Sequence, residues 1–85
     1  MTKNEALKKN FDLATDFNIF VAKNPSVVKN LPVKANIIFM TSGNSKINSY
    51  NDKLGKAILC EEKFPVFKAI KVKNSWKLEE MVAIC

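Results

Sequence analysis

The chain has 85 residues, of which 47% are hydrophobic and 26% charged. That length allows one hydrophobic core and excludes a second domain, so the sequence predicts a single domain over residues 1–85. Fourteen basic residues against eight acidic ones give a formal net charge of +6, and every basic residue is a lysine. The absence of histidine excludes imidazole-based proton transfer and most zinc sites, and the absence of arginine disfavours base-specific DNA recognition.

The N-terminal segment has the pattern of an amphipathic helix. Thr2 and Glu5 are spaced as in a capping box. Pro25 ends the helix, and Asn24 with Pro25 starts a short second helix that closes before Pro32. Apolar residues recur three or four apart and are expected to face the core: Leu7, Phe11, Ala14, Phe17 and Val21, with Leu13 and Phe20 broadening that face.

A strand, a helix and a second strand follow. The run over residues 35–40 is almost continuously apolar, which is typical of a strand covered on both faces. We expect a helix from Lys46 to Leu59, with Ser45 as its N-cap and Gly55 as a point of close packing, and a strand over 65–73. The predicted fold class is α/β: an N-terminal amphipathic helix, a short helix, and one βαβ unit with a two-stranded parallel sheet.

The C-terminal segment leaves two alternatives. Leu78, Met81, Val82 and Cys85 hold the spacing of a short helix, with Ser75 as its cap. The alternative is a frayed tail in which only Trp76 packs against the domain. We expect the short C-terminal helix.

Two cysteines are too few for a disulfide framework or a metal site. We therefore expect Cys60 and Cys85 to be reduced thiols. Cys60 follows a predicted helix, whose C-terminal dipole would raise a thiol pKa and discourage nucleophilic use. No metal and no cofactor is expected.

Several motifs occur in a characteristic order: Asn10-x-x-Leu13-x-x-x-Phe17, Asn24-Pro25, Leu31-Pro32, Ala35, Ile37-Ile38-Phe39, Tyr50-Asn51-x-x-Leu54 and Pro65-Val66-Phe67. Over roughly residues 5–73 this order resembles a family of short bacterial and archaeal proteins that form a domain of unknown function. The resemblance implies no activity. It also implies an acidic stretch after the first strand, where this chain has Ser42-Gly43-Asn44-Ser45-Lys46.

The loop between the first strand and the next helix is a candidate anion or ligand site, because free N–H groups at a helix start attract anions. Its residues are Thr41, Ser42, Gly43, Asn44, Ser45 and Lys46. The alternative interpretation is ordinary turn chemistry, since the loop contains neither a dinucleotide nor a P-loop pattern.

Lysines gather in the second half of the chain and predict a basic surface. They are Lys46, Lys53, Lys56, Lys68, Lys71 and Lys73. Such a surface could bind a nucleic-acid backbone through counterion release. The alternative, which the missing arginines favour, is a solvated surface that keeps a small protein soluble. The lysine bias itself could reflect a genome rich in A and T.

No pair of carboxylates is placed for acid and base catalysis, so we expect a protein that is not an enzyme. No run approaches the ~20 apolar residues of a membrane span, and we expect a cytoplasmic protein without membrane contact. The small sheet and the apolar surplus of Phe11, Leu13, Phe17 and Phe20 predict an oligomeric module, a homodimer or one with a protein partner. The alternative function is binding of nucleic acid or a phosphate ligand through the lysines and the Thr41–Lys46 loop.

Overall fold

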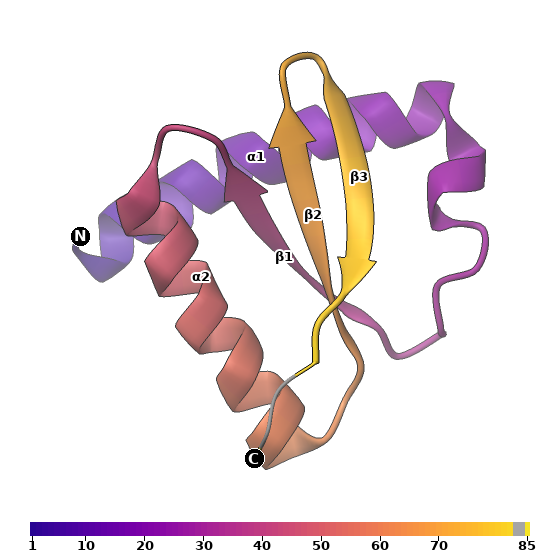
Figure 1. The fold of residues 1–85 in the computed structure, drawn as a ribbon. Helices are drawn as coiled ribbons and strands as arrows, with labels where there is room; N and C mark the ends of the chain where they lie inside the picture. The colour runs from indigo at the N-terminus through magenta and orange to yellow at the C-terminus, as the bar shows by residue number, and fades with distance from the viewer. Residues whose placement is uncertain (83–84) are drawn as a thin grey trace.

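The structure, a computed structural model, describes residues 1–82 and 85. Two helices and three strands make up an α/β fold (Figure 1). In chain order the elements are α1 (Lys3–Lys23), the short 3-10 helix η1 (Pro25–Val28), β1 (Asn36–Thr41), α2 (Ser45–Ala57), the π-helical turn η2 (Ile58–Glu62), β2 (Val66–Val72) and β3 (Ser75–Glu80).

The sheet has three strands in the order β1-β2-β3, so the prediction of a two-stranded sheet is wrong. β1 and β2 are parallel, as the βαβ pattern predicted, with Phe39 opposite Ala69. β3 pairs with β2 in the antiparallel direction and brings Leu78 opposite Ala69. The third strand adds the backbone pairing that the two-stranded prediction lacked.

Both predictions for the C-terminal segment are wrong for the residues that the structure describes. Ser75–Glu80 is strand β3, and Lys73 makes the turn that precedes it with φ 58°. Within β3 the side chains of Trp76 and Leu78 are more buried than their neighbours, which is the period of two that a strand requires. The helical spacing of Leu78, Met81 and Cys85 therefore does not reflect a helix over Ser75–Glu80, which is a strand.

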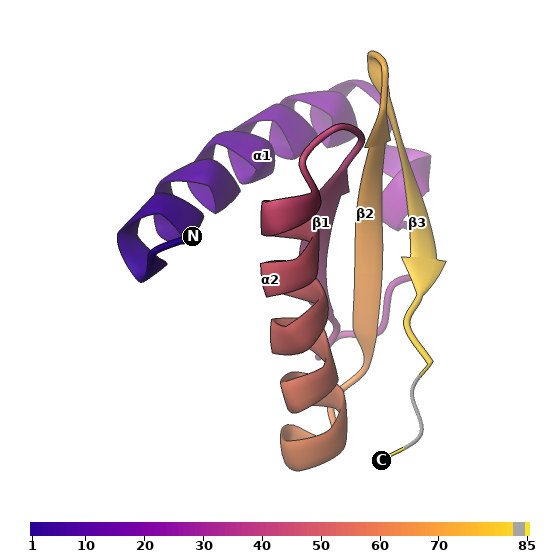
Figure 2. The same ribbon diagram turned by 60° about the vertical axis from the view of Figure 1, so that its left-hand side comes forward.

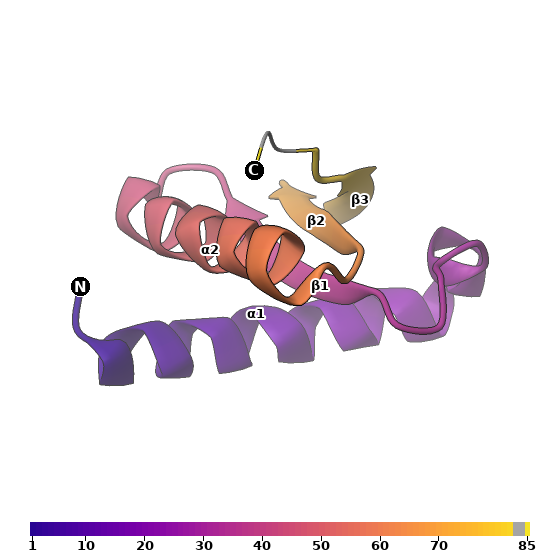
Figure 3. The same cartoon turned by 90° about the horizontal axis from the view of Figure 1, so that it is seen from below.

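The two helices cover different sides of the sheet. Viewed from below, α1 and α2 lie on either side of β1, and α1 forms the outer layer on its side (Figure 3). The larger core lies between α1 and the sheet and contains Ala6, Leu13, Phe17, Ile47, Ala69 and Trp76. A smaller core of Ile38, Val66 and Met81 lies on the other side, against the end of α2.

Helix α1 begins with the predicted capping box. The Thr2 hydroxyl accepts from the Glu5 amide at 3.2 Å, and the Thr2 amide donates to the Glu5 carboxylate at 3.1 Å. The predicted core face is wrong at Leu7 and Phe11, whose side chains are 59% and 72% exposed. The buried stripe is rotated towards Ala6, Leu13 and Phe17, because the sheet lies on that side of the helix.

Aromatic packing anchors α1. The Phe17 ring meets the rings of Phe39 and Trp76 edge to face, at centroid distances of 5.8 and 5.2 Å. Phe39 and Trp76 are 5.9 Å apart and complete a triangle of three rings. Each such contact contributes beyond the area it buries. One residue from each of α1, β1 and β3 thus fixes the helix across the sheet.

Helix α2 starts one residue earlier than predicted, at Ser45 instead of Lys46. Asn44, not Ser45, is its N-cap, and the Asn44 side chain accepts from the Ile47 amide at 3.2 Å. The prediction of close packing at Gly55 is confirmed. A Cβ atom there would lie 2.8 Å from Ile38 Cδ1 and 2.9 Å from Met81 Sδ.

The expectation of reduced thiols is wrong. Cys60 and Cys85 form a disulfide with their Cα atoms 5.3 Å apart. Strand β3 runs antiparallel to β2 and so returns the end of the chain to η2, where Cys60 lies. No helix in residues 1–82 is long and apolar enough to cross a bilayer.

Candidate functional site

A hydrogen-bonded pair of asparagines, with Asn51 buried and Asn10 half-buried, links α2 to α1. Asn51 is 1% exposed. Its amide nitrogen donates to Asn10 Oδ1 at 2.7 Å and to the Phe39 carbonyl at 2.8 Å, and Asn10 Nδ2 donates back to Asn51 Oδ1 at 2.9 Å. A buried amide is stable only when its polar atoms are paired, so this network fixes both helices against β1.

A second asparagine closes the outer edge of β1. The Thr41 amide donates to Asn48 Oδ1 and Asn48 Nδ2 donates to the Thr41 carbonyl, both at 2.9 Å. With Asn51 on the Phe39 carbonyl, side chains of α2 occupy the positions where another strand would bond. This end of β1 is therefore not free to pair with a strand of another molecule.

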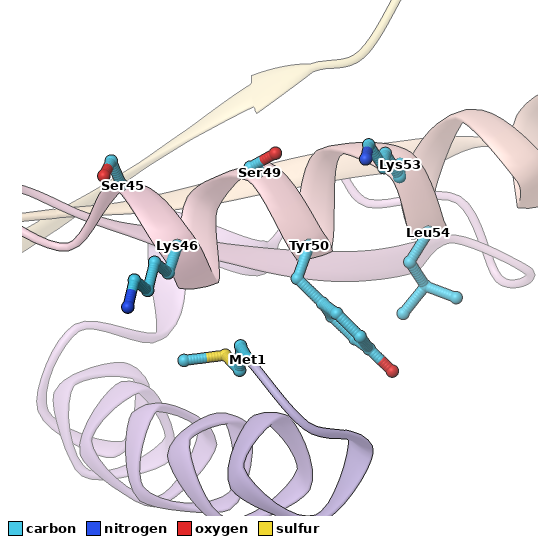
Figure 4. Close-up of a pocket in the computed structure, with 7 residues that line it drawn as sticks. All are labelled: Met1, Ser45, Lys46, Ser49, Tyr50, Lys53 and Leu54. Carbon is cyan, nitrogen blue, oxygen red and sulfur yellow. The ribbon is translucent and has the colours of Figure 1, made fainter.

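The helices leave a cleft beside this network. It has a volume of about 750 Å³ and is lined by Met1, Ser45, Lys46, Ser49, Tyr50, Lys53 and Leu54. Figure 4 shows the Tyr50 and Leu54 side chains on the side of α2 that faces α1 and Met1. The cleft combines an apolar floor with a basic rim.

Exposed apolar side chains are found on α1 as well as in the cleft. Leu54 is 46% exposed and also lines a smaller cavity with Asn10, which connects α2 to α1. On α1 the exposed Leu7 and Phe11 are one turn apart. We call Leu7, Phe11, Tyr50 and Leu54, with Met1, the helix-pair surface.

Some residues of the predicted ligand loop have a structural role, and others line the cleft. Both backbone groups of Thr41 bond Asn48, Gly43 has φ 87°, and the Asn44 side chain takes up one free N–H of the helix start. Ser45 and Lys46 line the cleft. Local structure thus fixes three of the six loop residues, and two others line the cleft.

The predicted basic residues do not form one stripe. Lys46 and Lys53 share the cleft, whereas Lys56 pairs with Asp52 at 3.0 Å. Lys68 and Lys71 are three residues apart in β2 and point to opposite faces of the sheet. Lys73 lies in the turn between β2 and β3.

The sequence did not predict an ionic cluster between α1 and the strands β2 and β3. Asp16 accepts from Lys71 Nζ at 2.7 Å and from Trp76 Nε1 at 3.2 Å. The hydrogen bond from Lys71 is the main reason that the pKa of the Asp16 carboxyl is lowered, and the bond from Trp76 adds to it. Sixty positions separate Asp16 from Trp76, so no local pattern could have indicated this contact.

A model described as "Family of unknown function (DUF5647)" matches residues 5–83. The chain belongs to this family. The match confirms the resemblance drawn from the ordered motifs and extends it to the third strand. No curated protein and no solved structure matches the chain. In this DUF5647 member the quoted motif residues Asn10 and Asn51 form the hydrogen-bonded amide pair, and Leu13 and Phe17 lie in the larger core.

Proposed function

We propose that this DUF5647 member is a non-catalytic interaction module that works as a homodimer. The observation that carries the proposal is the helix-pair surface, where Leu7 and Phe11 stand exposed on a rigid helix. Large apolar side chains gathered on one face mark sites of association in soluble proteins. The proposal concerns self-association first, with another protein partner as the alternative occupant.

The total surface area supports a second copy as the partner. The chain exposes 5995 Å². A compact monomer of 9.6 kDa should expose about 5,100 Å². The excess of about 900 Å² is close to the ~800 Å² that each partner buries in a stable complex. A homodimer would bring the exposed area into the normal range.

The homodimer is proposed through the helices and not through the edge of the sheet. A two-stranded sheet would have needed a partner at its edge, but the sheet has three strands and α2 closes part of the β1 edge. The reason to expect a dimer now lies on the helices. Variants of residues on the helices, and not of residues at the edge of the sheet, therefore test the homodimer.

Sedimentation equilibrium over a wide concentration range tests the proposal. We expect a reversible shift from a 9.6 kDa species to one of twice that mass as concentration rises. A single species of monomer mass up to millimolar concentration would refute self-association. Light scattering after size exclusion provides an independent measurement of the mass.

Binding of an anion or a nucleic-acid backbone is the second candidate. The observation in its favour is that Lys46 and Lys53 line one cleft with the Ser45 and Ser49 hydroxyls. Because backbone binding releases counterions, retention of RNA or DNA on a filter should fall steeply with salt. Retention that Lys46→Gln and Lys53→Gln do not change would refute a site in this cleft.

The cytoplasmic location stays a prediction, and the Cys60–Cys85 disulfide is the observation against it. Cytosolic thiols are normally kept reduced, whereas disulfides persist in oxidising compartments. Free thiols can be alkylated at the moment of cell lysis and counted by mass spectrometry. The number of alkylated cysteines decides between the cytoplasm and an oxidising compartment. Two alkylated cysteines support the cytoplasm, and none supports an oxidising compartment.

A further inference from the structure

Helix α1 carries a second regular stripe beside the one that packs on the sheet. Its residues are Asn4, Leu7, Phe11, Ala14, Asn18 and Val21, which we call the α1 outer strip. They are spaced three, four, three, four and three apart, which is the spacing of a helix that packs along another helix. The larger core explains the buried stripe of Ala6, Leu13 and Phe17, and Val21 at the end of the second stripe also packs against it. The exposed Leu7 and Phe11 are not part of that core.

The α1 outer strip is accessible and uncharged. Asn4, Leu7, Phe11 and Asn18 are exposed, and Ala14 and Val21 are half-buried. α1 forms the outer layer on its side of the sheet, so a second helix can approach it (Figures 2 and 3). A charge-free strip along a helix of 21 residues is unusual for a face that meets only water.

From this we infer that two copies of the chain pair through their α1 outer strips, with the two α1 helices antiparallel. The inference rests on the proposed function, since it names the surface and the geometry of the homodimer proposed there. A twofold axis between residues 11 and 14 places Phe11 opposite Ala14 of the second copy. It also places Leu7 opposite Asn18 and Asn4 opposite Val21, so each larger apolar side chain meets a smaller or polar one.

Charge selects the antiparallel direction over the parallel one. The first half of α1 contains Lys3, Lys8 and Lys9 with one acid, and the second half contains Asp12 and Asp16 with one lysine. A parallel pair would place Lys3 beside Lys8 of the other copy along the same flank, where like charges repel. The antiparallel pair places the basic half beside the acidic half and also opposes the two helix dipoles.

Matched serine variants test the location of the interface. Phe11→Ser removes the central apolar side chain of the strip, and we expect the dimer dissociation constant to rise about tenfold or more. Ile19→Ser is the control, because Ile19 is 55% exposed on the other flank of the same helix. The control should change the constant less than about twofold. Circular dichroism confirms that both variants keep the helix.

An exchange of sizes tests the pairing itself. Ala14→Phe alone should weaken the dimer, because two phenylalanines would then compete for one layer. Phe11→Ala combined with Ala14→Phe should restore most of the affinity, since the large and small partners are merely exchanged. Additive weakening in the double variant would overturn the pairing of residue 11 with residue 14.

A distance measurement tests the direction. A nitroxide on Asn4→Cys can be attached while Cys60 and Cys85 remain in their disulfide. In the antiparallel pair the two labels should lie about 25 Å apart or more along the helix axis, against about 10 Å in a parallel pair. The shorter distance would overturn the inferred direction.

The outcomes separate this inference from the proposed function. A dimer that survives Phe11→Ser, or that is lost equally in Ile19→Ser, overturns the α1 outer strip as the interface while homodimerisation stands. A strict monomer at all concentrations overturns both.

Discussion

The two sides of the sheet are stabilised in different ways. Against α1, three aromatic rings from three elements interlock, and stability comes from the volume of large side chains. Against the end of α2, Ile38, Val66 and Met81 form a small core that depends on the missing side chain of Gly55 and on a disulfide. A chain of this length can fill one core with bulk, and it secures the second by close approach and a covalent bond.

Removing bulk from the larger core should have the greatest effect. Phe17→Ala deletes the ring that both Phe39 and Trp76 contact, and should lower the free energy of unfolding by about 4 kcal/mol. Urea denaturation followed by Trp76 fluorescence measures the change. Phe20→Ala, at a half-buried position on the same helix, should cost clearly less. Equal losses would show that the triangle of rings has no special weight.

Opening the disulfide should come second and should affect the smaller core. The bond closes a loop over 25 positions, and its loss should lower the free energy of unfolding by about 3 kcal/mol. The double variant Cys60→Ser with Cys85→Ser should reproduce the effect of a reducing agent. The reductant should then leave that variant unchanged, and a further loss on its addition would contradict the assignment.

The pair of Asn10 and Asn51 links α1 to α2, and its loss should have the third largest effect on the free energy of unfolding. Asn51→Ala leaves Asn10 and the Phe39 carbonyl without their partner, at a cost of about 2 kcal/mol. The change should be accompanied by faster hydrogen exchange at the ends of both helices. In a double-mutant cycle with Asn10→Ala, the two costs should not add, because both changes break the same bonds. Strict additivity would argue against the pair.

The smallest expected effect is on pH dependence at the Asp16 cluster. The pKa of Asp16 is lowered in the folded chain, chiefly by its hydrogen bond from Lys71, so the acid stabilises the fold above its unfolded pKa of about 3.8. That contribution is lost as pH falls through the lowered pKa. Because the pair is partly exposed, we expect less than about 1 kcal/mol between pH 5 and pH 2. Asp16→Asn should flatten this part of a stability profile, and an unchanged slope would contradict it.

Local signals in the sequence predicted the order of the elements from α1 to β2. Four correct predictions each depend on a few adjacent residues or on the special backbone of proline or glycine. They are the capping box at Thr2, the helix end before Pro25, the parallel pairing of two strands and the close packing at Gly55. Helix spacing alone could not tell which stripe of α1 faces the sheet. Two apolar stripes lie about a quarter-turn apart there, and the broader set included Leu7 and Phe11 in error.

Contacts between distant residues could not be predicted. β3 was missed because six residues with one buried aromatic match a strand or a helix about equally well, and pairing with β2 decided between them. The disulfide followed from β3, since only the antiparallel return brings Cys85 to Cys60. Of the seven residues that line the cleft, three appeared in the candidate sites: Ser45, Lys46 and Lys53. Met1 joins them only because the start of the chain lies beside α2.

The disulfide also divides the chain by connectivity. Residues 60–85 form a covalent ring that contains all of β2 and β3, whereas α1 and β1 lie on the open part of the chain. A protease that cleaves after Lys73, in the turn between β2 and β3, would open the backbone without releasing a fragment. The nicked protein would keep its mass until reduced, and then separate into two pieces. Strand β3 thus stays attached to η2 through a bond that the backbone does not provide, while β2 remains joined to η2 by the backbone itself.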